Sequence, residues 1–282
     1  DRVYANIYAE INRRAREKAA TFLTASGGAS SAQDAHERAI QAEEALLRSW
    51  VGDLAPSSNR GNHTSDDGGG GGGALTCEYF QDRTKQYPFF CGADGHALLQ
   101  RLLSHNVHLL RANMNLVLQQ GDPQFVMAQG ELIYEMKPSL KAYNKTWSQD
   151  EYGHPGLQRT YIKLKSFQRF TETWATLERT AAEGLFDEWK EGGKSNIGGG
   201  AARPLRVASI GGGPGYELLA MQMFFERFAP GVPLEFVSLD LCPSWRKYVE
   251  TLGYRFEHWD IHSGDLLGKL GMAPGELDYV II

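Results

Sequence analysis

The chain has 282 residues, of which 42% are hydrophobic and 22% are charged, as in ordinary globular proteins. Its formal net charge of -5 is not that of a typical nucleic-acid-binding protein, although a local basic face is compatible with it. No apolar run approaches the roughly 18 residues that a membrane-spanning helix needs, so we expect no membrane partner. The cysteines Cys77, Cys91 and Cys242 are far apart and form no C-x-x-C pair. This predicts reduced thiols in an intracellular protein, without a metal site.

The first 54 residues (1–54) are predicted to form N-terminal helices. Apolar residues recur at helical spacing between charged ones, first at Val3, Ile7, Ile11 and Ala15. A second helical run has its apolar residues at Ala39, Ala42, Leu46, Leu47 and Trp50. Residues 55–74 are predicted to be a linker, because a stretch rich in glycine and serine has too little apolar surface to fold.

Residues 75–191 are predicted to form a helical region. It opens with an aromatic-rich segment, residues 78–92, which we expect to pack as a loop or turn. A strong helix over 93–120 follows, because its leucines recur three and four residues apart. Shorter helices and then one long helical run over 158–193 are expected next. Residues 192–204 are predicted to be a second, glycine-rich linker.

The long helical run contains the sequence YIKLKSFQRF, in which cations alternate with aromatic rings. The cations are Lys163, Lys165 and Arg169, and the rings belong to Tyr161, Phe167 and Phe170. Two interpretations remain open at this point. The segment is either an RNA-facing strip of cations and stacking rings or an amphipathic helix with a solvated basic face. The second arrangement is the commoner one.

After residue 205 the periodicity of the sequence changes. Four short β-type runs, LRVASI, LEFVSLDL, YRFEHWD and LDYVII, alternate with helix-type segments. Strands that alternate with helices indicate a parallel sheet. We therefore predict an α/β fold for residues 205–282, with about four parallel strands, preceded by an all-helical N-terminal region.

The first strand of this region runs into the glycine-rich sequence IGGGPGYEL. A turn between a strand and a helix lies at the carboxyl edge of a parallel sheet, where such folds bind ligands. Glycine permits a positive φ and a close approach of the backbone to a ligand. The spacing of Gly211, Gly213 and Gly215 is G-x-G-x-G. A dinucleotide fingerprint would need glycine in place of Tyr216, and no Gly-Lys-Ser/Thr follows as a P-loop would require.

Together, IGGGPGYEL and the later FVSLDL resemble motifs one and two of the class I S-adenosylmethionine-dependent methyltransferases. The resemblance covers residues 205–282 and implies a Rossmann-like sheet with S-adenosyl-L-methionine as the cofactor. That family's sheet has seven strands, and this sequence stops after the fourth. The sheet is thus expected to be incomplete, and the segment to be inactive by itself. The residues that usually contact the methyl acceptor follow the fourth strand, so no catalytic residue is identified.

The resemblance also implies roles for individual residues. The glycine turn, with Gly211, Gly212, Gly213 and Gly215, would lie against the methionine portion and the ribose of the cofactor. Asp240 at the end of the second strand would accept both ribose hydroxyls, with Leu241 beside it. Asp260 would bind the adenine amino group, and Ile261 would lie along the ring. The family often has an acidic residue at the position of Ser209, and Glu217 is the candidate to replace it.

Three functions follow as hypotheses. The first is a methyltransferase for an unknown acceptor, with RNA or protein as candidates, which the helical region would dock. The second is a catalytically silent, methyltransferase-like assembly protein, which the serine at position 209 favours. The third is an NAD(P)-binding oxidoreductase, which Pro214 and Tyr216 disfavour. Without a ligand, the glycines would form only a tight turn and Asp240 would be a helix N-cap.

Overall fold

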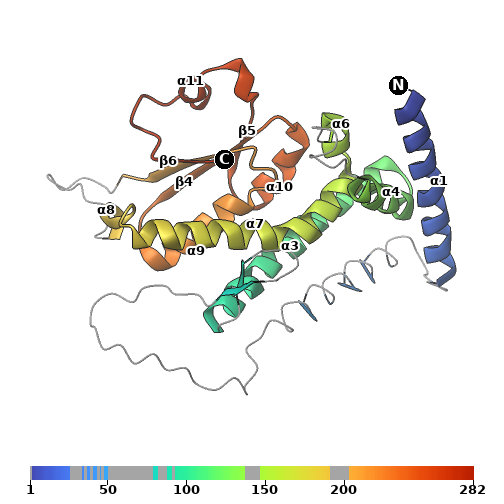
Figure 1. The fold of residues 1–282 in the computed structure, drawn as a ribbon, viewed down its shortest axis with the longest axis horizontal. Helices are drawn as coiled ribbons and strands as arrows, with labels where there is room; N and C mark the ends of the chain where they lie inside the picture. The colour runs from blue at the N-terminus through green and yellow to red at the C-terminus, as the bar shows by residue number, and fades with distance from the viewer. Residues whose placement is uncertain are drawn as a thin grey trace.

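The computed structural model describes residues 2–25, 79–81, 88–90, 93–136, 147–190 and 203–282, together with isolated positions between 34 and 49. Most of the second predicted N-terminal helix, the linker 55–74 and most of the linker 192–204 lie outside the described residues. The fold is α/β, with a parallel sheet on one side and a layer of long helices on the other (Figure 1). None of the described helices is long and apolar enough to cross a membrane.

The sheet has four parallel strands, as predicted from the β-type runs. They are β3 (Leu205–Ile210), β4 (Leu234–Asp240), β5 (Arg255–His258) and β6 (Tyr279–Ile281). Their order in the sheet is β5-β4-β3-β6. The first two crossovers therefore run in one direction from β3, and the third returns to its other side. This reversal is the switch point at which open α/β sheets bind ligands, and all the strand ends at that edge are carboxyl ends.

Short and long helices connect these strands. They are α9 (Tyr216–Phe228), the 3-10 turn η1 (Pro243–Trp245) with α10 (Arg246–Thr251), the 3-10 turn η2 (Ile261–Ser263), and α11 (Leu266–Leu270). The helices α9 and α10 pack on the face of the sheet that carries Val207, Phe236 and Phe256. On the opposite face, Leu270 of α11 packs in a smaller cluster with Ala208, Val237 and Leu239. Helices therefore pack on both faces of the sheet, although Val280 of β6 stays exposed.

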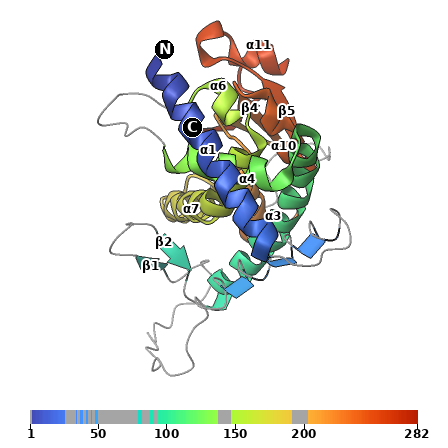
Figure 2. The same ribbon diagram turned by 90° about the vertical axis from the view of Figure 1, so that its right-hand side faces the viewer.

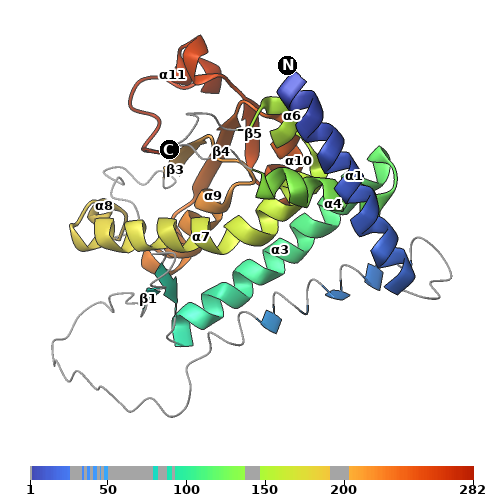
Figure 3. The same ribbon diagram turned by 45° about the vertical axis from the view of Figure 1, so that its right-hand side comes forward.

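The helical layer precedes the sheet in the sequence. Its members are α1 (Arg2–Ala25), α3 (Ala93–Gln120), α4 (Pro123–Glu135), α6 (Gln149–Tyr152), α7 (Pro155–Ala182) and α8 (Asp187–Lys190). The long helix α7 contacts both α3 and α9, and Figure 3 shows it running beside both. Trp174 of α7 stacks on Phe170 and meets Phe224 of α9 edge to face. One apolar core therefore extends from the helical layer into the sheet.

The helix α1 lies across α4 at the far end of the layer (Figure 2). Ile11 and Ala15, which the sequence predicts to share an apolar face, are both buried there. The helices α4 and α7 also cross closely, because Gly130 and Gly156 let the two backbones touch. A Cβ atom at Gly130 would lie 1.9 Å from the carbonyl carbon of Gly156.

Two segments of the helical region differ from the prediction. Residues 79–81 and 88–90, expected within a loop or turn, form the antiparallel pair β1 (Tyr79–Gln81) and β2 (Pro88–Phe90). Aromatic side chains favour strands, and a proline is tolerated where a strand has a free edge. The long helical run is also divided. α7 ends at Ala182, and Gly184 adopts a φ of 82° before α8 begins.

Candidate functional site

The glycine turn lies where the sequence predicts it, between the end of β3 and the start of α9. Gly211, Gly213 and Gly215 have φ values of 66°, 48° and 91°. Residues other than glycine rarely adopt such positive φ values. A Cβ atom at Gly211 would have no heavy atom within 4 Å, so the space beside this residue is open. The turn therefore presents backbone rather than side chains at the carboxyl edge of the sheet.

Two buried hydroxyl groups support the turn from below. Ser209 of β3 and Ser238 of β4 are paired in the register of the sheet. A Cβ atom at Gly212 would lie 2.6 Å from the Ser209 Oγ and 2.7 Å from the Ser238 Oγ. Within the described part of the chain, the Ser238 Oγ has no hydrogen-bond partner. Small residues at all three positions let the turn sit directly on the strand ends.

Asp240, the last residue of β4, is bonded to this turn. Its Oδ2 accepts a hydrogen bond of 3.0 Å from the Gly213 N–H, and its Oδ1 accepts one of 2.8 Å from the Cys242 N–H. Burial raises the pKa of Asp240, while the two N–H donors and nearby His258 act in the opposite direction. The bond to Gly213 joins the second strand to the turn after the first. The bond to Cys242 is a local turn in which an aspartate accepts from the N–H two residues later. The alternative of a helix N-cap is wrong, because the N-cap of η1 is Cys242.

Glu217 lies in the first turn of α9, beside a cation from the helical layer. Its side chain is only 15% exposed, and its Oε1 is 3.8 Å from the Nε of Arg169 on α7. Burial raises the pKa of Glu217, and Arg169 opposes that shift. Tyr161 of α7 is near the same group and packs against Trp245, with ring centroids 5.4 Å apart. One wall of the site therefore comes from α7.

The sequence marks Arg169 only as one cation of a basic strip. Arg169 lies near Glu217 only because α7 packs against α9. No local sequence pattern predicts that packing. The same packing decides between the two interpretations of that strip. Phe167 and Phe170 are buried in the core, so these rings face inward and cannot stack on a base. The segment is an amphipathic helix.

The remaining predicted site residues are Leu241, directly after β4, and Asp260 with Ile261, after β5. The Asp260 Oδ1 accepts a hydrogen bond of 2.9 Å from the His262 N–H and so caps η2. Leu241, after β4, is 41% exposed, and Ile261, after β5, is 55% exposed. Each of these two apolar side chains thus lies exposed next to one of the candidate carboxylates, Asp240 or Asp260.

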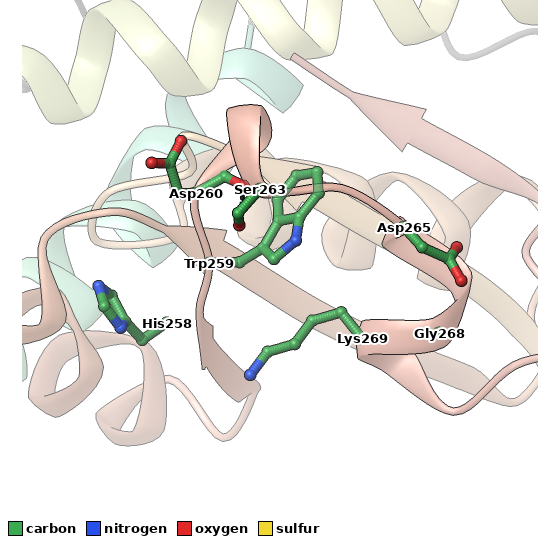
Figure 4. Close-up of a pocket in the computed structure, with 7 residues that line it drawn as sticks. All are labelled: His258, Trp259, Asp260, Ser263, Asp265, Gly268 and Lys269. Atoms are coloured by element: carbon green, nitrogen blue, oxygen red, sulfur yellow. Dashed lines mark hydrogen bonds between the residues drawn. The ribbon is translucent and has the colours of Figure 1, made fainter.

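A hollow of about 490 Å³ adjoins the β5 side of this edge (Figure 4). Its lining residues are His258, Trp259, Asp260, Ser263, Asp265, Gly268 and Lys269. The Trp259 indole lies at its centre, and the carboxylates of Asp260 and Asp265 lie toward opposite ends. Asp260 is the one predicted site residue that reaches it. The hollow therefore lies beside the candidate site, whose centre is the glycine turn.

The arrangement has no recognisable metal centre in the part of the chain that the structure describes. Among those residues, no group of three or more His, Cys, Asp or Glu side chains could hold a metal ion. Cys242 is a buried free thiol, and burial raises its pKa, which disfavours the reactive thiolate. The site therefore offers carboxylates and one guanidinium as its polar side chains. The N–H groups of Gly211, Gly213 and Gly215 already donate to acceptors within the protein.

Comparisons of the chain with models of protein families, with curated proteins and with solved structures find no match. The geometry of the site consequently carries the functional argument.

Proposed function

We propose that the carboxyl edge of the sheet binds S-adenosylmethionine and that the protein is a methyltransferase that uses it. The observation that carries the proposal is the hydrogen bond between Asp240 and Gly213. It holds a carboxylate from the second strand beside the glycine turn that follows the first strand, in which Gly211 is exposed. A carboxylate suits a ribose because its two oxygens can accept from both neighbouring hydroxyls.

The residues around this bond fit such a cofactor. The open space beside Gly211 admits a ligand against the backbone. The exposed side chains of Leu241 and Ile261 supply apolar cover for an adenine ring, with Asp260 as an acceptor for its amino group. Glu217 and Arg169 carry opposite charges 3.8 Å apart, which matches the ammonium and carboxylate groups of the methionine portion.

When bound, S-adenosylmethionine supplies a methyl carbon that its sulfonium already makes electrophilic. The contribution of the protein is then to bind and orient. Asp240 would fix the ribose, and Glu217 with Arg169 would fix the opposite end. In this proposal the acceptor is an RNA or a protein that the helical layer docks. Phe167 and Phe170 are buried and Tyr161 packs against Trp245, so the rings of the basic strip of α7 do not favour the RNA alternative.

A second candidate function is a silent assembly module with the same fold. It is favoured by the observation that both oxygens of Asp240 already accept backbone N–H bonds. In that case Asp240 would only connect the two loops that follow β3 and β4, and the glycines would form a turn without a ligand.

Calorimetric titration with S-adenosylhomocysteine and, separately, with NADH tests the proposal. We expect micromolar binding of the first compound and none of the second. Binding of NADH alone would replace the proposal with a nicotinamide-dependent oxidoreductase. Binding of neither, by a protein whose circular dichroism shows it to be folded, would favour the assembly module.

A further inference from the structure

A chain of hydrogen bonds connects the helical layer to Asp240. It begins on α3, where the Asn113 Nδ2 donates to the hydroxyl of Tyr248 on α10 at 2.8 Å. That hydroxyl donates in turn to the Gln158 Oε1 on α7 at 2.9 Å. Asn113 is itself fixed, because its Nδ2 also donates to the Pro155 carbonyl at 2.8 Å. The first part of the chain thus joins three helices.

The second part of the chain leads from α7 to the site. The Gln158 Nε2 donates to the Ser244 Oγ at 2.5 Å, and this oxygen lies 3.1 Å from the Cys242 Sγ. The Cys242 N–H then donates to the Asp240 Oδ1 at 2.8 Å, and the other oxygen of Asp240 accepts from Gly213. The bonds and contacts therefore reach from the middle of the molecule to the glycine turn.

Most members of this chain are buried. Asn113, Gln158 and Tyr248 have no exposed surface, and Cys242 is nearly covered. A buried amide is costly when it is left unpaired, whereas apolar side chains of the same shape would pack at this position without that risk. A fully bonded buried chain fixes the geometry of its members more tightly than apolar packing does. This points to a role in orientation beyond packing.

We infer that Gln158 of α7 is a positioning residue for Asp240, acting through Ser244 and Cys242. Glutamine suits this position because its amide accepts from Tyr248 and donates to Ser244 at once. The helical layer then sets where the Asp240 carboxylate lies, although Gln158 itself does not touch the ligand. The consequence for cofactor affinity rests on the proposed function; the effect on the loops does not.

Hydrogen exchange of the ligand-free protein tests the positioning directly. In Gln158→Met, which keeps the shape and removes the amide, we expect the Gly213 and Cys242 amide protons to exchange at least about fivefold faster, as in a locally loosened loop. Thr171→Val is the matched control. It removes another buried hydrogen bond of α7, the one to the Phe167 carbonyl, and should leave both amides at the wild-type rate.

Titration with S-adenosylhomocysteine provides the second readout. Gln158→Met is expected to weaken binding by about fivefold to tenfold, the effect of one lost buried hydrogen bond. Ser244→Ala breaks the same chain closer to the site. If both substitutions act through Asp240, their effects should not add. The double variant should then bind S-adenosylhomocysteine about as well as whichever single variant binds it less tightly. Additive losses in this double-mutant cycle would overturn the inference.

The two arms separate this inference from the proposed function. If the wild-type protein binds no S-adenosylhomocysteine, the proposed function fails, while faster exchange at Gly213 in Gln158→Met still supports the positioning role. Wild-type exchange rates in a folded Gln158→Met protein overturn the positioning role, whatever the ligand result. If Gln158→Met does not fold, Ser244→Ala carries the exchange test, because Ser244 is partly exposed and replacing it removes only a hydroxyl.

Discussion

Two parts of the molecule use glycine for opposite reasons. At the crossing of α4 and α7, Gly130 and Gly156 let two helices touch, and a Cβ atom at Gly156 would lie 2.1 Å from the Val126 carbonyl oxygen. At the glycine turn, Gly211 has a positive φ and nothing within 4 Å of an added Cβ atom. No side chain fits between the two helices at Gly130 and Gly156, whereas Gly211 has open space beside it.

These two regions show that glycines needed for packing differ in their surroundings from glycines that leave room for a ligand. A glycine required by a close contact between backbones tells us how the helical layer is assembled. A glycine with open space beside it, at the carboxyl edge of a parallel sheet, leaves room for a ligand. The same residue type therefore supports a functional argument only when its surroundings are known.

The crossing should be the more sensitive of the two regions to added volume. Gly130→Ala is expected to destabilise the protein by about 3 kcal/mol or more, because two backbones would have to separate. Urea unfolding would measure the change. Glu131→Ala, which removes only an exposed ion pair with Lys18, is the neighbouring control and should cost less than about 1 kcal/mol. A similar small loss in Gly130→Ala would contradict the close crossing.

The helical layer should also respond to acid through His154. This residue caps α7 with its Nδ1, and burial lowers its pKa from 6.5 to about 4. The neutral ring favours the folded state, so stability is complete above pH 6.5 and is lost as the pH falls toward 4. We expect a loss of about 2–3 kcal/mol over that range. His154→Asn keeps a capping side chain and should flatten this part of the pH profile; an unchanged profile would exclude His154 as its source.

The glycine turn should show a smaller loss of stability with a specific effect on binding. Gly211→Ala is expected to cost about 1–2 kcal/mol, because alanine must adopt a left-handed conformation. Gly231→Ala is its matched control. Gly231 also has a positive φ and open space, but it precedes β4 at the opposite edge of the sheet. Calorimetry should show weaker binding of S-adenosylhomocysteine by Gly211→Ala alone, and equal losses in both variants would remove the turn from the site.

Glu217 should give the smallest effect on stability, with a sign that depends on pH. Burial raises its pKa above the ordinary value of 4.5, so the protonated form favours the folded state and that advantage is lost as the pH rises. Glu217→Gln should therefore be slightly more stable than the wild type at pH 7, by about 0.5 kcal/mol given the nearby Arg169. The difference should vanish near pH 4. Thermal unfolding at both pH values would measure it, and a destabilised variant at pH 7 would contradict this account.

Much of the sheet could be predicted from the sequence because its signals are local. A run such as LEFVSLDL predicts a buried strand by itself, and the glycines before Tyr216 mark the turn. The pair β1 and β2 was missed because its two strands are short, and only their pairing distinguishes them from a loop. The contacts of Arg169 and Gln158 were missed for a different reason. Both depend on how α7 packs against the sheet domain, which joins residues far apart in the sequence.

The most direct test of the central claim is a calorimetric titration of Asp240→Asn with S-adenosylhomocysteine. Glu235→Gln, at the amino end of the same strand, serves as the control. We expect binding by the wild type and by Glu235→Gln, and a loss of binding free energy of about 1.5–3 kcal/mol in Asp240→Asn, the scale of a hydrogen bond to a charged group. An unchanged dissociation constant in a folded Asp240→Asn protein would contradict the claim that this carboxylate holds the ligand.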